Sequence, residues 1–291
     1  MIRIGTRASA LALAQAQWVA QRLPNQVELV PMKTAGDRPA AAGDKSRWVW
    51  GLEHALLEGE IDLAVHSAKD VPAQLAPGLS LVAIPSRADP RDAICGASSL
   101  ASLAPGASVG TSSLRRAAQV RALRDDLNVV EIRGNVDTRL RKLAEAAVDA
   151  LVLACAGLER LGRLDEAGGV LDELVPAAGQ GALAVEARGG AVPAAVVDAL
   201  DDPSTATCVR AERELTRHLN ATCNTPVGAF ARPVEGGEVE LRGWVGLPDG
   251  SQWISDRLRG SPDGLGAAVA ERMLAAGAGE LLRQAQRGLA A

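Results

Sequence analysis

Two short segments combine hydroxyl and arginine side chains at points where a strand is expected to pass into a helix. They are residues 5–9 (Gly-Thr-Arg-Ala-Ser) and residues 110–116 (Gly-Thr-Ser-Ser-Leu-Arg-Arg). A Ser or Thr at a helix start caps free backbone N–H groups, and the remaining N–H groups and the helix dipole favour an anion. An arginine there adds a planar fork that grips a carboxylate at two points. Each segment alone also fits an ordinary N-cap, but the pair suggests a cleft that holds several carboxylates or phosphates.

The region around the second segment is locally basic. Residues 111–142 carry eight basic and four acidic side chains, a net charge of +4 in a chain whose total is −4. Arg133, Gly134 and Arg139 extend the anion-binding surface, and Gly134 would let the backbone approach a ligand closely. The alternative is a solvated basic face.

A third polar segment, residues 66–72 (His-Ser-Ala-Lys-Asp-Val-Pro), follows a buried strand that begins at Ile61. In an open α/β sheet, ligands bind at the carboxyl ends of strands. Pro72 biases Val71 toward an extended conformation, in which adjacent side chains point to opposite sides. Asp70 could then face a developing positive charge while Lys69 grips a substrate anion. The alternative is a surface turn held by a salt bridge.

The four cysteines fall into two kinds of surroundings. Cys223 lies in a polar loop, residues 220–226, where a thiol can act as a nucleophile or attachment point. Cys95, Cys155 and Cys208 lie in apolar runs and are expected to be inert core thiols. No C-x-x-C pair occurs and there are only three His, so no zinc site is expected. We expect free thiols in a reducing cytosol.

The elements that must position these residues alternate between apolar and amphipathic runs, which indicates an α/β fold. Strands are expected at 2–5, 27–32, 61–66, 79–84, 129–132, 150–154, 182–186, 227–231, 239–245 and 252–258. Helices are expected at 11–23, 48–57, 114–123, 137–146, 205–219 and 264–287. Turn-rich stretches at 85–90 and 176–181 are read as crossings between domains. The expected division is 1–86 with 177–202, 87–176, and an α+β domain at 203–291.

Composition excludes some classes of protein. Of the 291 residues 47% are hydrophobic, which is enough for a sizeable core. Aromatic residues are only 2%, so platforms for stacking single-stranded nucleic acid are nearly absent. The negative total charge gives no pull toward nucleic acid or an anionic membrane. No uncharged apolar stretch reaches the length of about 18 residues that spans a membrane, and no signal peptide is evident, so a cytoplasmic protein is expected.

Taken together, these segments resemble the porphobilinogen deaminase family. The resemblance runs in order through residues 6–9, 66–72, 89–93, 110–116, 133–136 and 179–182, and through Cys223 just before 226–228. It implies two lobes like those of periplasmic binding proteins and a smaller C-terminal domain that carries a dipyrromethane cofactor by a thioether, here on Cys223.

The resemblance also implies the reaction. A transferase of heme and tetrapyrrole biosynthesis, hydroxymethylbilane synthase, adds four porphobilinogen units to the cofactor with loss of ammonia and releases hydroxymethylbilane. Each pyrrole carries an acetate and a propionate, so an arginine-lined cleft suits the growing chain. The expected partner is porphobilinogen alone, with no metal, nucleic acid or membrane, and the expected state is a monomer.

The resemblance assigns roles residue by residue. Asp70 is the expected catalytic residue, contacting pyrrole N–H groups and stabilising the cation left when ammonia departs. The expected cofactor-binding residues are Cys223, Arg7, Lys69, Asp70, Ser113, Arg115, Arg116, Arg133 and Gly134. The expected substrate-binding residues are Arg7, Arg133, Arg139, Arg160, Ser67 and Lys45.

The sequence departs from the family at its lid. Where the family has a glycine-rich lid segment, this chain has Gly-Asp-Lys-Ser-Arg-Trp at 43–48. Where the family has two glycines before the cofactor cysteine, this chain has Ala221 and Thr222. Two alternatives therefore stay open at this point: a two-lobed binding protein for an anionic small molecule, and a relative whose altered lid impairs catalysis.

Overall fold

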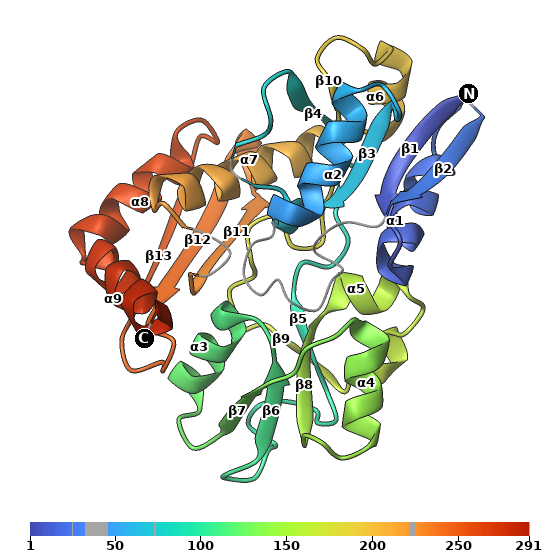
Figure 1. Cartoon of the computed structure of the whole chain (residues 1–291). Coiled ribbons are helices and arrows are strands. Elements are labelled where there is room, and N and C mark those ends of the chain that lie inside the picture. Colours follow the sequence, from blue (N-terminus) through green and yellow to red (C-terminus); the bar gives the residue numbers. More distant parts are fainter. Residues whose placement is uncertain (25, 33–45, 73, 222–224, 291) are drawn as a thin grey trace. The chain divides into compact units, whose positions relative to one another are not determined.

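The computed structural model describes the whole chain except residues 25, 33–45, 73, 222–224 and 291 (Figure 1). The chain divides into two units by its internal contacts. Unit 1 consists of Met1–Ala88 and Gly181–Thr207, and unit 2 of Asp89–Gln180 and Cys208–Ala291. A further division of unit 2 into a second lobe and a C-terminal domain stays a prediction.

Unit 1 is built on a mixed five-stranded sheet. Its strand order is β2 (Val27–Met32), β1 (Ile2–Arg7), β3 (Leu63–Ser67), β10 (Leu183–Arg188) and β4 (Leu79–Ala83). The first three strands are parallel, whereas β10 is antiparallel to both neighbours. Apolar side chains of α1 (Ala10–Ala20) and α6 (Ala194–Leu200) pack on one face, and those of α2 (Ser46–Leu57) pack on the other.

Unit 2 contains a second mixed five-stranded sheet with a similar arrangement of strands. Its order is β7 (Asn128–Glu131), β6 (Ser108–Thr111), β8 (Ala150–Ala154), β5 (Asp92–Cys95) and β9 (Gly169–Leu171), with β5 antiparallel to its neighbours. Helix α3 (Leu114–Leu123) covers one face, and α4 (Val136–Ala144) and α5 (Cys155–Arg160) cover the other. In both sheets three parallel strands stand beside a reversed strand, so polar residues that follow the parallel strands share one sheet edge.

The C-terminal part of unit 2 is an antiparallel sheet of β11 (Val227–Pro233), β12 (Val239–Gly246) and β13 (Trp253–Gly260). Alternate side chains of these strands form a core with α7 (Pro203–His218), α8 (Leu265–Ala275) and α9 (Ala278–Ala290). Figure 1 shows these helices beside the sheet. On the opposite face Trp244 packs against Ala118 of α3 and Val175. The short 3₁₀ segments are η2 (Ala68–Asp70), η3 (Leu164–Glu166) and η4 (Glu235–Gly237).

The expected fold class, an α/β protein with a smaller C-terminal α+β part, is confirmed. The single helix expected at 264–287 is wrong, because Gly277 has a φ of 104° and the chain turns there between α8 and α9. Strands β5 and β9 and helices α5 and α6 were not predicted, since each has seven residues or fewer and shows too little periodicity. None of the described helices is long and apolar enough to cross a membrane.

Candidate active site

One edge of the unit 1 sheet gathers several of the predicted residues. Strand β1 ends at Arg7 and its parallel neighbour β3 ends at Ser67, so both lie at the carboxyl edge. Ser9 caps α1 as predicted, since its side chain accepts a hydrogen bond from the Ala12 N–H at 3.3 Å. Gln15 Nε2 donates to Ser67 Oγ at 2.8 Å, which ties α1 to the end of β3.

Lys69 and Asp70 come directly after this edge, in the 3₁₀ turn η2, and both are half-buried. The extended conformation expected for them is therefore wrong, although Val71 is extended with φ −73° and ψ 126°. Successive side chains of a 3₁₀ helix are separated by about 120°, so the two charged groups still point in different directions.

A buried acid–base pair lies behind the same edge. His66 Nε2 is 3.0 Å from Glu186 Oε2, and the two side chains are 5% and 0% exposed. Glu186 Oε1 has no hydrogen-bond partner among the residues that the structure describes. On α2, burial raises the pKa of the Glu53 carboxyl, and the charge of Glu186 raises it further. Sequence reasoning missed Glu186, although a single carboxylate in an apolar strand signals a buried partner.

In unit 2, Arg139 bridges the N-termini of two helices. Ser113 caps α3 as predicted, and Asn135 caps α4 by accepting from the Thr138 N–H at 2.8 Å. Arg139 Nη2 donates to Ser112 Oγ at 2.8 Å, and its Nε donates to the Gly134 carbonyl at 2.8 Å. The guanidinium thus lies where both helix N-termini favour negative charge.

The charge of Arg139 is poorly compensated. It forms no ion pair with a carboxylate of the described chain, and burial together with the nearby charge of Arg116 lowers its pKa to about 10. Burial likewise lowers the pKa of Arg160 to about 10. An anionic ligand would relieve the cost of keeping these cations partly dehydrated.

Arg133 and Gly134 both have close neighbours within the chain. Arg133 is exposed and its Nε lies 2.7 Å from Glu131 Oε1, a solvent-accessible ion pair. Gly134 has a φ of 125°, and an added Cβ would come within 2.7 Å of Thr138 Cγ2. The close approach that requires this glycine is therefore to the first turn of α4.

Arg115 and Arg116 are buried, at 5% and 6% exposure, and both contact Asp92. Arg115 Nη1 donates to Asp92 Oδ2 at 2.8 Å and to the Val175 carbonyl at 2.8 Å. Arg116 Nε donates to Asp92 Oδ1 at 2.9 Å, and Gln180 Nε2 donates to the same oxygen at 2.8 Å. Burial alone would raise the pKa of Asp92, but the two guanidiniums hold it well below its usual range.

This buried cluster corrects one expectation. A solvated basic face is wrong for Arg115 and Arg116, because their first partner is a carboxylate of the chain itself. The three charged side chains still sum to one positive charge, and Arg115 Nε has no partner within the described part of the chain. The sequence did not reveal Asp92 as the partner, although a carboxylate at the head of the apolar run 93–95 needs cations to be buried.

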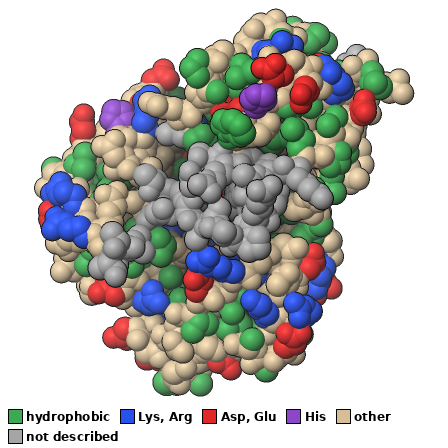
Figure 2. Space-filling view, in the orientation of Figure 1, with side chains coloured by type: hydrophobic (Ala, Val, Ile, Leu, Met, Phe, Trp, Pro, Cys, Tyr) green, Lys and Arg blue, Asp and Glu red, His purple; other side chains and the backbone are tan. Residues whose placement is uncertain are grey.

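On the face shown in Figure 2, basic and acidic side chains are interspersed over the part of the molecule that holds β6, β7 and α4. Cys95, Cys155 and Cys208 are buried, as expected, and burial raises the pKa of the Cys95 and Cys155 thiols to about 11 each. Cys223 and Lys45 lie outside the described residues.

The sheets and half-buried arginines define an α/β protein suited to anionic ligands. A family model described as porphobilinogen deaminase, dipyromethane cofactor binding domain, matches residues 2–193, and one described as porphobilinogen deaminase, C-terminal domain, matches residues 206–275. Porphobilinogen deaminase of Thiobacillus denitrificans is 46% identical over 299 residues, covering 97% of both chains. That of a Roseiflexus species is 48% identical over 298 residues, covering 96% of this chain and 97% of the relative.

The chain therefore belongs to the porphobilinogen deaminase family. It is a transferase of tetrapyrrole biosynthesis with porphobilinogen deaminase (hydroxymethylbilane synthase) activity and a dipyrromethane cofactor. Among solved structures, a periplasmic substrate-binding protein of an ABC transporter from Coxiella burnetii is similar with a TM-score of 0.43 and 16% identity, covering 71% of this chain and 94% of that chain.

Proposed function

We propose that the strand–helix junctions of the two units hold the carboxylates of the pyrrole chain. The observation that carries this proposal is Arg139, a half-buried cation without a carboxylate partner in the described chain, bonded only to Gly134 and Ser112. Arg116 adds a second positive charge nearby, and the capped N-terminus of α3 adds a third favourable contribution. In unit 1, carboxylates are bound in the same way by Arg7, Ser67 and Lys69, at the carboxyl edge of β1 and β3.

The donor set fits the dipyrromethane cofactor, whose side chains are acetates and propionates. A carboxylate binds more strongly to a cation that is already partly dehydrated than to a fully solvated one. Arg115, with one N–H unpartnered among the described residues, can add a further bond from inside unit 2. When bound, the cofactor supplies the pyrrole end to which porphobilinogen units are joined.

Cys223 is the proposed attachment residue. Ionisation of Cys95 and Cys155 is suppressed by burial, with a pKa of about 11 for each, and the thiolate is the reactive form. Cys208 is also buried, in the core around the C-terminal sheet. Cys223 is the one remaining cysteine of the chain and occupies the family's cofactor position.

Asp70 is proposed to stabilise positive charge on the reacting pyrrole after ammonia leaves. The half-buried turn η2 holds the residue just past the end of β3. A carboxylate fixed there before the reaction begins needs no reorganisation when the cation forms, which is the largest single contribution in many enzymes.

The test of the carboxylate-binding proposal is Arg139→Gln, with Arg141→Gln as the control. Arg141 lies on the same helix but is exposed and paired with Glu145 at 2.8 Å. Loss of a charged hydrogen bond weakens ligand binding about ten- to a hundredfold. We expect Arg139→Gln to raise KM for porphobilinogen by that factor and Arg141→Gln to leave it unchanged. Equal kinetics in both variants would refute the role of Arg139.

We also propose that the enzyme works as a monomer in the cytoplasm. Cys95 and Cys155 carry no disulfide, a thiol state that a reducing compartment preserves. The exposed large apolar side chains of the described chain are scattered through its sequence, from Met1 to Leu274. Light scattering of the purified enzyme tests the monomer: a mass of twice the 30.0 kDa chain would contradict it.

A further inference from the structure

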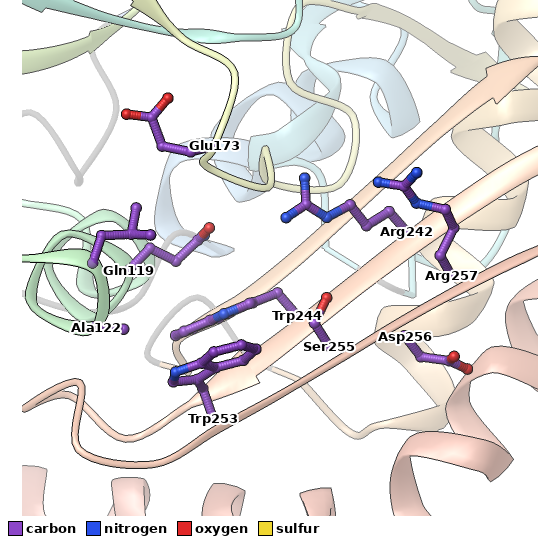
Figure 3. Close-up of a pocket in the computed structure, with 10 residues that line it drawn as sticks. Gln119, Ala122, Glu173, Arg242, Trp244, Trp253, Ser255, Asp256 and Arg257 are labelled. Atoms are coloured by element: carbon purple, nitrogen blue, oxygen red, sulfur yellow. The ribbon is translucent and has the colours of Figure 1, made fainter. Parts of the chain in front are cut away.

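A pocket lies in unit 2, apart from every residue assigned above. It has a volume of about 370 Å³ and opens between the end of α3, the segment around Glu173, and the face of β12 and β13 that is turned away from the C-terminal core (Figure 3). A volume of this size suits a small ligand of one or two rings.

Two arginines of this pocket stand directly opposite each other. Arg242 on β12 and Arg257 on β13 are register partners in the antiparallel sheet. Like charges in that position repel and destabilise the sheet. Burial lowers the pKa of Arg242, and the charge of Arg257 lowers it further.

These two guanidiniums differ from other arginines around the same sheet. Arg232 pairs with Glu240 at 3.0 Å, Arg259 with Glu238 at 2.5 Å, and Arg272 with Asp256 at 2.6 Å. The side chains of Arg242 and Arg257 form no hydrogen bond or ion pair with any residue in the described ranges of the chain. The two acidic residues that line the pocket do not compensate them: Asp256 is held by Arg272, and Glu173 forms no ion pair with either arginine.

The other end of the pocket is flat and apolar. Trp244 and Trp253 lie there, while the guanidiniums of Arg242 and Arg257 lie at the opposite end (Figure 3). Trp244 is 5% exposed and packs on Ala118 and Val175, whereas Trp253 is 53% exposed. Indole rings offer their faces to other flat rings.

We infer that this pocket binds a small flat aromatic molecule bearing two carboxylates. The ring lies against the tryptophans, and each carboxylate receives one guanidinium, which removes the repulsion across β12 and β13. Because α3 and the C-terminal sheet both line the pocket, the bound molecule also joins these two parts of unit 2. The inference does not depend on the residue roles proposed for the active site.

The test uses isophthalate as the probe on the purified holoenzyme. Tryptophan fluorescence should change saturably as isophthalate is added, because Trp253 lines the pocket. Arg242→Gln and Arg257→Gln should each raise the dissociation constant about ten- to a hundredfold. Arg259→Gln is the matched control, since Arg259 lies on the same strand but has its own carboxylate partner, and it should bind as the wild type does.

Three further results decide the matter. Inorganic phosphate, which lacks a ring, should bind at least about tenfold more weakly than isophthalate; equal binding would reduce the pocket to a general anion site and refute the inference. No binding of isophthalate, or equal affinity in wild type and Arg242→Gln/Arg257→Gln, would also overturn it. Turnover of porphobilinogen is measured on the same preparations, so failure of this inference is distinguishable from failure of the proposed active site.

Discussion

One cation of this enzyme, Arg139, is held partly dehydrated without a carboxylate partner in the described part of the chain. Arg139 and Arg160 each have a pKa lowered to about 10, chiefly because burial disfavours their charged forms. Such a residue is poised to bind an anion, because the cost of removing its water is met already during folding. Asp70 is half-buried too, and we propose that a cation forms beside its carboxylate during the reaction.

Replacement of Asp70 should separate charge from position. Asp70→Asn removes the negative charge and should abolish most turnover while the protein still folds and holds its cofactor. Asp70→Glu keeps the charge but displaces it by one methylene, so it should retain intermediate activity. Turnover of porphobilinogen and thermal unfolding are measured on the same preparations. If the activity of the variants merely followed the fraction of folded protein, Asp70 would have only a structural role.

Replacement of Cys223 should remove the covalent cofactor. We expect Cys223→Ser to fold, to have the mass of the polypeptide alone, and to show no turnover. Cys95→Ala and Cys155→Ala should keep the added dipyrromethane mass, because their thiols are buried and un-ionised at neutral pH. Intact-mass spectrometry checks all three variants, and a dipyrromethane on a peptide without Cys223 would contradict the assignment.

At the scale of elements, Asp92 joins strand β5 to helix α3. The carboxylate at the start of the strand receives both arginines of the first turn of the helix, and Gln180 adds a bond from the segment before β10. Removing one partner of such a buried group leaves the other charges uncompensated. The cluster therefore fixes the helix whose N-terminus faces the proposed carboxylate site.

Asp92→Asn should lower the free energy of unfolding by about 3–5 kcal/mol at pH 7. Asp92 has a folded pKa below the unfolded value of about 4, so its stabilisation is fully present above that pH and is lost as the pH falls toward the folded pKa. The difference between wild type and variant should therefore shrink below about pH 4. Urea unfolding at pH 7 and pH 3 checks this. Asp126→Asn, at an exposed pair with Arg124, should change little at either pH.

The sequence predicted the elements that have strong periodicity or clear caps. Helix α3 was expected at 114–123 and is found there, because Ser113 caps it and apolar residues recur along one face. The polar strand ends at Ser67 and Thr111 were also expected. The pairing of Arg115 and Arg116 with Asp92 was not, because their ion pairs join residues 23 and 24 positions apart through the sheet. The turn at residues 68–70 was missed because one proline biases only the residue before it.

At the scale of the whole molecule, one carboxylate ties the segment before β10 to the C-terminal sheet. Glu212 on α7 is fully buried, and its two oxygens accept from the Gly179 N–H at 2.6 Å and the Ala231 N–H at 2.8 Å. A buried N–H without an acceptor costs about 1–3 kcal/mol. This side chain therefore helps to hold unit 2 together over segments far apart in the sequence.

Glu212→Ala should lower the free energy of unfolding by about 1–3 kcal/mol for each of the two N–H groups it leaves unpaired. Glu214→Ala on the same helix is the comparison, because Glu214 is only half-buried and accepts from the Gly266 N–H alone at 3.0 Å. Chemical denaturation of both variants checks the order. A loss in Glu212→Ala no larger than that in Glu214→Ala would show that the double contact adds nothing.

The place of β10 in the sheet of unit 1 has a consequence for synthesis on the ribosome. Strand β4 pairs with β10 and not with β3, and Ala83 meets Val185 about 100 residues further along the chain. When the first 88 residues have been synthesised, β4 cannot yet join the sheet, because its neighbour β10 has not been made. This strand stays unpaired until the chain has been translated past residue 188. Closing so long a loop is slow compared with local pairing. A nascent chain thus leaves this part of unit 1 exposed to proteases and chaperones while the next hundred or so residues are made, although it is the first part to be synthesised.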